Sequence, residues 1–162
     1  MGLPHTVLIK RLTNELQRCS GYIGSDITFD PEKAVFPMEI TVNMINVPAY
    51  AKTDGTMMQI SEHSYRLYIN EEYPYEKPRV KWETPIFHPN IMPPEDGGYV
   101  CIKLLDKWSF GSTLLSFMKA LEHLVVNPNA SNPFGSEICA ESAEFFMNNE
   151  ARIKASVTFG GL

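Results

Sequence analysis

The first half of the chain contains short runs in which apolar and polar residues alternate, separated by turn signals. The clearest run extends from Pro37 to Val47, and such alternation is typical of a strand with one buried face. Asp54-Gly55 marks the next turn, and further strands are predicted over residues 57–70 and 79–82. A short strand is also expected around Ile27. Strands joined by short turns pair in an antiparallel manner, so the sequence predicts a four-stranded antiparallel meander.

Helices flank this predicted sheet in the sequence. Residues 6–19 place their leucines on one stripe, with Thr6 as the expected N-cap. A central amphipathic helix is predicted over residues 113–127, where an Asn-Pro pair stops it. C-terminal helical regions are expected over residues 136–147 and 151–157. Successive strands with helices covering one side of the sheet indicate an α+β fold.

Composition and charge exclude several classes of protein. A length of 162 residues, with 44% apolar and 20% charged residues, is typical of one globular domain, here residues 1–162. The net charge of −5 argues against a general nucleic-acid binder, which would need a basic face. No apolar run approaches the roughly 20 residues that a membrane helix requires. We therefore expect neither nucleic acid nor a membrane among the partners.

The cysteines indicate a reducing compartment. Cys19, Cys101 and Cys139 are widely spaced and form no Cys-x-x-Cys pair, so we expect no metal site. The N-terminus lacks the charged start and apolar middle of a signal peptide. Reduced thiols in the cytoplasm or the nucleus are therefore predicted.

Cys101 lies within a long irregular stretch from Glu83 to Gly111 that is dense in proline and aromatic residues. Loops of this length inside a domain are usually functional or disordered, and this composition argues against disorder. A lone cysteine is commonly a buried structural residue. Gly97-Gly98 just upstream nevertheless favours an accessible thiol. A thiolate is a good nucleophile and a good leaving group, which suits an enzyme that accepts an acyl group and passes it on.

His88-Pro89-Asn90 precedes this cysteine and has two interpretations. One is a tight turn, because asparagine after proline is ordinary turn chemistry. The other is that the Asn90 amide donates a hydrogen bond to the oxyanion that forms when an amine attacks a thioester. His88 is a candidate general base, although we favour a structural role in which its ring bonds to loop backbone.

Several motifs occur in an order that resembles the ubiquitin-conjugating enzyme family. The order is Tyr-Pro-x-x-x-Pro from Tyr73, then His88-Pro89-Asn90, Cys101, Trp108 and a helix that ends at Asn127-Pro128-Asn129. The resemblance implies that Cys101 accepts ubiquitin or a ubiquitin-like modifier as a thioester from an activating enzyme. The modifier then passes to a lysine amine of a protein substrate, usually with a ligase, and Asn90 is the amide of the family motif. No cofactor is implied, since the activating enzyme uses the ATP, and the chain lacks a phosphate-binding Gly-rich Lys-Ser/Thr motif.

The chain departs from the family pattern close to Cys101. The segment 91–100 is longer than usual and is expected to alter the rim of the active site. Lys103 stands where an acidic residue is common, and Asn132 replaces an aspartate thought to orient or deprotonate the incoming lysine. A free lysine amine has a pKa near 10.4, so it needs desolvation or a proton acceptor before it can attack a thioester at neutral pH. The acceptor-side candidates, which could orient or deprotonate this amine in place of the aspartate, are Glu95, Asp96 and Asp106, or a group of the ligase or the substrate.

Residues of the first helix and of two loops match the surface that binds ligases in the family. Lys10 and Arg11 lie off the apolar stripe of the first helix, where a basic face is either simply solvated or a docking surface for an acidic partner. Tyr75 and Phe110 lie in the two loops. They are either partly packed loop aromatics or an apolar anchor for a RING-type ligase.

Two rival functions remain open. One is a catalytically inactive variant of the same fold that only binds modifiers or partner proteins, which Lys103 and Asn132 leave possible. The other is an unrelated cysteine hydrolase that pairs Cys101 with His88 or His123, although no orienting partner is recognisable. The Gly160-Gly161 pair near the C-terminus is like the end of a modifier, but the preceding helical pattern does not resemble the small modifier fold.

Overall fold

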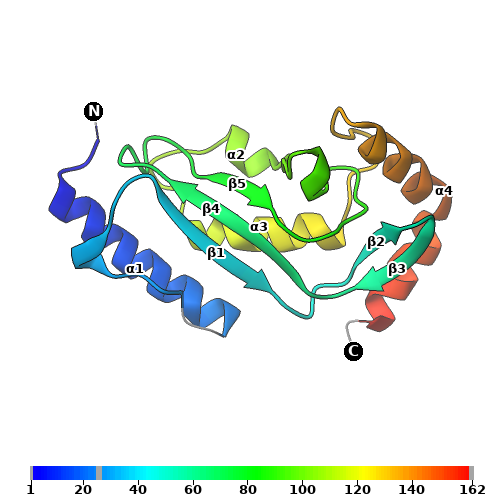
Figure 1. Cartoon of the computed structure of the whole chain (residues 1–162), viewed down its shortest axis with the longest axis horizontal. Coiled ribbons are helices and arrows are strands. Elements are labelled where there is room, and N and C mark those ends of the chain that lie inside the picture. The colour runs from blue at the N-terminus through cyan, green and yellow to red at the C-terminus, as the bar shows by residue number, and fades with distance from the viewer. Residues whose placement is uncertain (1, 25–26, 161–162) are drawn as a thin grey trace.

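The computed structural model describes the backbone of residues 2–24 and 27–160, and the side chains in these ranges except those of residues 103, 104 and 150–160. The tail residues Gly161 and Leu162 and the Lys103 side chain therefore lie outside the described part. In chain order the elements are α1 (His5–Ile23), β1 (Met38–Met44), β2 (Ala49–Thr53), β3 (Thr56–Ile60), β4 (His63–Ile69), β5 (Arg79–Trp82), α2 (Lys103–Asp106), α3 (Leu114–Val126) and α4 (Glu137–Gly160), with 3₁₀ turns η1 (Pro31–Lys33) and η2 (Pro94–Asp96) (Figure 1).

The central sheet is antiparallel and has the strand order β1-β4-β5. Met38 pairs with Ile69 and Met44 with His63, while Tyr65 of β4 pairs with Trp82 of β5. Buried and exposed residues alternate strictly along β1, as expected for a strand with one buried face.

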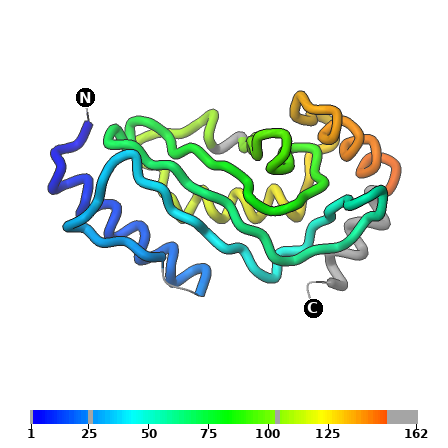
Figure 2. Tube along the Cα trace, in the orientation of Figure 1, coloured from blue at the N-terminus to red at the C-terminus, as the bar shows by residue number. Residues whose placement is uncertain are grey.

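Helices α1 and α3 cover the apolar face of this sheet. Their buried stripes join the inward side chains of the strands in one hydrophobic cluster, while the other face of β1 carries exposed polar residues. The Cα trace shows α3 passing behind the strands and α1 alongside β1 (Figure 2). The predicted α+β class, with an N-terminal helix, an antiparallel sheet and C-terminal helices, is confirmed. The helical stripes are Leu8, Leu12 and Leu16 in α1, and Leu114, Phe117, Met118, Leu121 and Val125 in α3.

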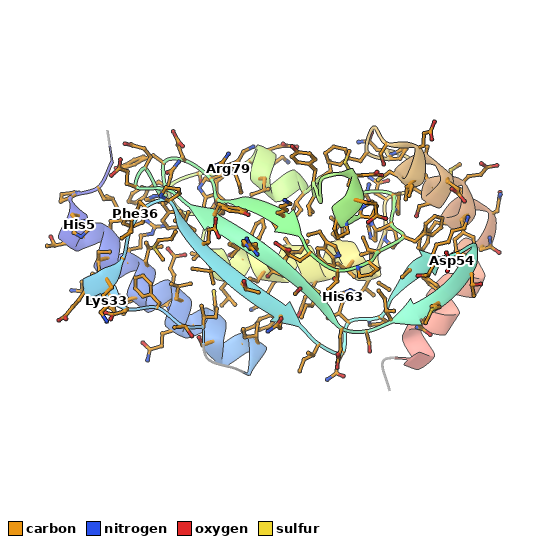
Figure 3. All side chains as sticks on the ribbon, in the orientation of Figure 1. His5, Lys33, Phe36, Asp54, His63 and Arg79 are labelled. Carbon is orange, nitrogen blue, oxygen red and sulfur yellow. The ribbon has the colours of Figure 1, made fainter. Side chains whose placement is uncertain are left out.

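The strands differ in detail from the predicted four-stranded meander. The run over residues 57–70 is interrupted, so that β3 leaves the central sheet and forms a separate hairpin with β2, which the sequence analysis missed. The interruption occurs where the Val47 N–H donates to the Ser61 carbonyl at 3.1 Å and the buried His63 ring bonds to the Val47 carbonyl at 2.8 Å. Figure 3 shows His63 at this junction and Asp54 at the tip of the hairpin.

Two further predictions were wrong at the level of single residues. Ile27 is in irregular structure, where its N–H donates to the Ser20 hydroxyl at 2.9 Å instead of to a neighbouring strand. Thr6 does not cap α1, because the helix already begins at His5 after Pro4 and has no side-chain cap. The predicted start of the central helix is confirmed, with the Thr113 hydroxyl accepting from the Ser116 N–H at 3.1 Å.

The two predicted C-terminal helical regions both lie within α4, which is kinked between them at Asn149, a residue with non-helical backbone angles. The Asn149 side chain donates to the Phe145 carbonyl at 2.8 Å at this bend. None of the helices within the described ranges is both long enough and apolar enough to cross a membrane.

Candidate active site

Cys101 is exposed, whereas the other two cysteines of the chain are buried. Burial raises the pKa of the Cys19 thiol to about 12, and burial also raises the pKa of the Cys139 thiol. Both buried thiols therefore stay protonated at neutral pH, and a protonated thiol is a poor nucleophile. Within the described residues, no group of three or more His, Cys, Asp and Glu side chains could hold a metal ion.

The backbone brings Asn90 next to Cys101, although residues 91–100 separate them in the chain. Ile91 forms antiparallel bridges with both His88 and Val100. The Cys101 N–H then donates to the Asn90 carbonyl at 2.9 Å. The structure thus joins the two motifs that the sequence analysis singled out.

The Asn90 side chain ties the turn at residues 88–91 to the loop after α3. Its Nδ2 group donates to the carbonyls of Asn129 and Asn132, each at 3.1 Å, and its Oδ1 accepts from the Asn129 N–H at 2.8 Å. Asn90 is 3% exposed, and both of its amide hydrogens are engaged. To donate to a bound oxyanion, the amide must release one of these two carbonyls.

His88 is a buried connection between this turn and α3. Its Nε2–H donates to the Leu124 carbonyl at 2.8 Å, and its Nδ1 accepts from the Asn90 N–H at 3.0 Å. The ring is 1% exposed, and burial lowers the pKa of His88 to about 4. Both nitrogens are engaged within the protein, which favours the structural interpretation of His88 over a proton acceptor at the cysteine.

Because His88 is neutral when folded, stability is expected to fall in mild acid. The unfolded chain binds a proton at this ring below its ordinary pKa of 6.5, while the folded chain does so only below about 4. The contribution of His88 to the free energy of unfolding should therefore drop by about 3 kcal/mol as the pH falls from above 6.5 to 4, and His63, whose pKa burial also lowers, should add to the drop. Urea unfolding across this range measures the slope. His88→Gln should be less stable at pH 7 but show a shallower slope; an unchanged slope would contradict the assignment.

A cavity of about 420 Å³ opens beside Cys101. It lies between the cysteine segment, one face of the second half of α3 and the loop that follows this helix. Asp106, one of the acceptor-side candidates, lines it together with Asn132, whereas Glu95 and Asp96 are not among its described lining residues. Its lining residues are Asn90, Cys101, Ile102, Asp106, Ala120, His123, Leu124, Asn127, Asn129 and Asn132.

The sequence matches the family model of ubiquitin-conjugating enzymes over residues 11–158. The chain belongs to the ubiquitin-conjugating enzyme family. The ubiquitin-conjugating enzyme E2 21 of Caenorhabditis elegans is 30% identical over 84% of this chain and 60% of its own length. The NEDD8-conjugating enzyme UBC12 of Yarrowia lipolytica is 26% identical over 74% of this chain and 66% of its own length. The chain thus spans less than two thirds of the length of these curated relatives.

Solved structures of ubiquitin-conjugating enzymes share the fold. The E2 domain of a Toxoplasma gondii ubiquitin conjugating enzyme superposes with a TM-score of 0.60 at 20% identity, covering 98% of this chain and 96% of that one. Ubc12 of Saccharomyces cerevisiae superposes with a TM-score of 0.59 at 22% identity, covering 91% and 76%. The expected family fold is therefore confirmed.

The residues expected to bind a ligase in this ubiquitin-conjugating enzyme family member lie close together. The rings of Tyr75 and Phe110 are 5.4 Å apart and are 56% and 50% exposed. The Arg11 guanidinium lies 4.8 Å from the centre of the Phe110 ring and donates to the carbonyls of Phe110 and Ser112. Arg11 therefore fixes the position of the second loop, while Lys10 lines an adjacent groove on α1.

Glu15 is a buried charge that the sequence analysis missed. Its carboxylate accepts from the Arg11 side chain at 2.9 Å, from the Tyr73 hydroxyl at 2.8 Å and from the Leu114 N–H at 2.8 Å. These contacts connect α1, the loop before β5 and the start of α3. The only sequence signal is a carboxylate next to the apolar stripe of a helix. A carboxylate in that position is usually solvated.

Glu15→Gln is expected to lower the free energy of unfolding by about 1.5–3 kcal/mol, because hydrogen bonds to a charged partner are lost in a buried site. Urea unfolding at pH 7 tests this. Glu62→Gln, at an exposed position, serves as the control and should change little. Equal destabilisation by both substitutions would mean that the Glu15 contacts contribute nothing specific.

Proposed function

We propose that this chain accepts ubiquitin or a ubiquitin-like modifier on Cys101 and transfers it to a lysine amine of a protein substrate. The observation that supports this most directly is the exposed Cys101 beside Asn90, at the edge of the cavity. In the first step the Cys101 thiolate attacks the thioester carbonyl that the activating enzyme presents. A new carbon–sulfur bond forms at Cys101, and the thiolate of the activating enzyme leaves.

In the second step the lysine amine attacks the carbonyl, and the Cys101 thiolate leaves as the amide forms. The carbonyl oxygen becomes negative in the transition state, and we assign its hydrogen-bond donor to the Asn90 amide. This assignment requires the loop at Asn129 and Asn132 to release one amide hydrogen. Asp106 is the candidate acceptor for the amine proton, since its side chain lines the cavity with Cys101.

A ligase is proposed to bind the surface formed by Tyr75 and Phe110. Two exposed rings at neighbouring loop tips offer an apolar anchor of the kind that concentrates binding energy at interfaces. Arg11 contributes by holding the Phe110 loop, and Lys10 and Arg18 supply the available positive charge in the adjacent groove.

A charging assay tests the proposal. The protein is mixed with an activating enzyme, ATP and a candidate modifier, with ubiquitin and ubiquitin-like modifiers tried in turn. We expect an adduct with one modifier that a reducing thiol removes. A chain that binds modifiers but never forms this adduct would instead be an inactive binding module, an alternative that the engaged hydrogens of Asn90 and the replacement at Asn132 favour.

A further inference from the structure

The longer segment before Cys101 forms a closed loop, residues 92–99, which contains η2. The Met92 N–H donates to the Tyr99 carbonyl at 2.8 Å, and the Pro93 carbonyl accepts from the N–H groups of Asp96 and Gly98. The Cα trace coils back on itself at this point (Figure 2). The 92–99 loop is therefore held by its own backbone hydrogen bonds.

Gly98 attaches this loop to the sheet. Its carbonyl accepts from the Trp82 N–H at 2.8 Å, at the end of β5. A Cβ atom at Gly98 would lie 2.5 Å from the Trp82 carbonyl oxygen, so only glycine permits this approach. The loop consequently has a fixed position relative to β5.

Tyr99 projects from the 92–99 loop in a defined orientation. Its ring is 61% exposed, yet one edge packs on Gly97, where a Cβ atom would lie only 2.7 Å from the ring. Gly97 has a φ of +113°, a backbone conformation that side chains other than glycine's disfavour. An exposed ring is thus kept in place by a residue that has to be glycine.

The backbone pairing around Val100 directs the side chains of Tyr99 and Cys101 to the same face of the segment. Val100 pairs with Ile91 in an antiparallel bridge, so the segment 99–101 is extended. Side chains two residues apart in an extended segment point to the same face, about 7 Å from each other. No residue of the 92–99 loop is among the described residues that line the cavity.

We propose that Tyr99 selects acceptors that carry their amine on an aliphatic stem, as the lysine side chain does. This inference rests on the proposed function, in which an amine must approach a thioester at Cys101. The four methylene groups of lysine can lie along an apolar ring while the amine extends beyond it. An N-terminal α-amine has no such stem. The ring therefore favours side-chain amines over α-amines by binding the stem, without contact with the reacting atoms.

Discharge of the charged protein tests this selection. The thioester is mixed with Nα-acetyl-lysinamide or with glycinamide, and single-turnover rates are measured over a range of acceptor concentrations. Tyr99→Ala should weaken apparent binding of the lysine compound by about 2- to 10-fold, the range expected for one aromatic contact. The limiting rate and the glycinamide reaction should be unchanged, and Tyr99→Phe should behave like the unaltered protein. Equal losses with both acceptors, or no loss with either, would overturn the proposal.

A second measurement needs neither modifier nor activating enzyme. The Cys101 thiolate attacks an alkyl methanethiosulfonate at sulfur, forming a mixed disulfide and releasing methanesulfinate. With Tyr99 in place, the butyl reagent should react faster relative to the methyl reagent than it does in Tyr99→Ala. Val35→Ala, which truncates another exposed apolar residue, should keep the original ratio. An unchanged ratio in Tyr99→Ala would contradict a stem-binding role, whereas failure of charging alone would count only against the proposed function.

Discussion

Replacing Cys101 by serine is expected to convert a thiol-labile adduct into one that resists reducing thiols, and replacing it by alanine should abolish the adduct. A serine hydroxyl in the same position forms an oxyester, which a thiol does not cleave under the same conditions. Alanine has no nucleophile. Charging reactions analysed on gels with and without reducing agent measure both outcomes, and the loss in Cys101→Ala should be complete.

The two buried cysteines supply the controls for this experiment. Cys19 and Cys139 are both 0% exposed. Cys139→Ala should therefore charge like the unaltered protein, provided that circular dichroism shows it to be folded. An adduct that persists in Cys101→Ala would place the chemistry at one of these two thiols, and the assignment of Cys101 would be wrong.

Asn90→Ala is expected to slow transfer to lysine by about 10²–10³-fold while charging of Cys101 proceeds. The amide is proposed to stabilise the oxyanion of aminolysis. The first step also passes through an oxyanion, but there the activating enzyme can supply donors of its own. Single-turnover discharge of the preformed thioester isolates the second step.

The same side chain also holds the loop at Asn129 and Asn132, so a structural loss has to be separated from a chemical one. Asn43→Ala removes an amide from the exposed face of β1 and should leave both steps unchanged. If Asn90→Ala reduces charging and transfer equally, Asn90 serves the fold rather than the reaction. A normal circular dichroism spectrum with slow transfer alone supports the oxyanion role.

The fold could be predicted where a pattern is local. The alternation in β1 and the apolar stripes of α1 and α3 each repeat with the period of their element, and the structure contains all three. The β2–β3 hairpin was missed because β2 is short and its outer residues are polar. The division of residues 57–70 depends on contacts with the segment after β1, which no local pattern encodes.

The site could be predicted only in part for a similar reason. Motif order indicated that Asn90 and Cys101 belong together, and the Ile91–Val100 bridge places them side by side. The partners of the Asn90 amide are backbone carbonyls beyond α3, and backbone groups carry no sequence signal. Glu15 was missed because two of its donors, the Tyr73 hydroxyl and the Leu114 N–H, come from distant parts of the chain.

The hydrogen bond from His88 to the Leu124 carbonyl joins α3 directly to the turn that carries Asn90. A shift of α3 at Leu124 would displace the His88 ring. The hydrogen bond from the Asn90 N–H to this ring would then displace the backbone of Asn90. The position of α3 and the placement of Asn90 next to the sulfur are therefore linked through one buried ring.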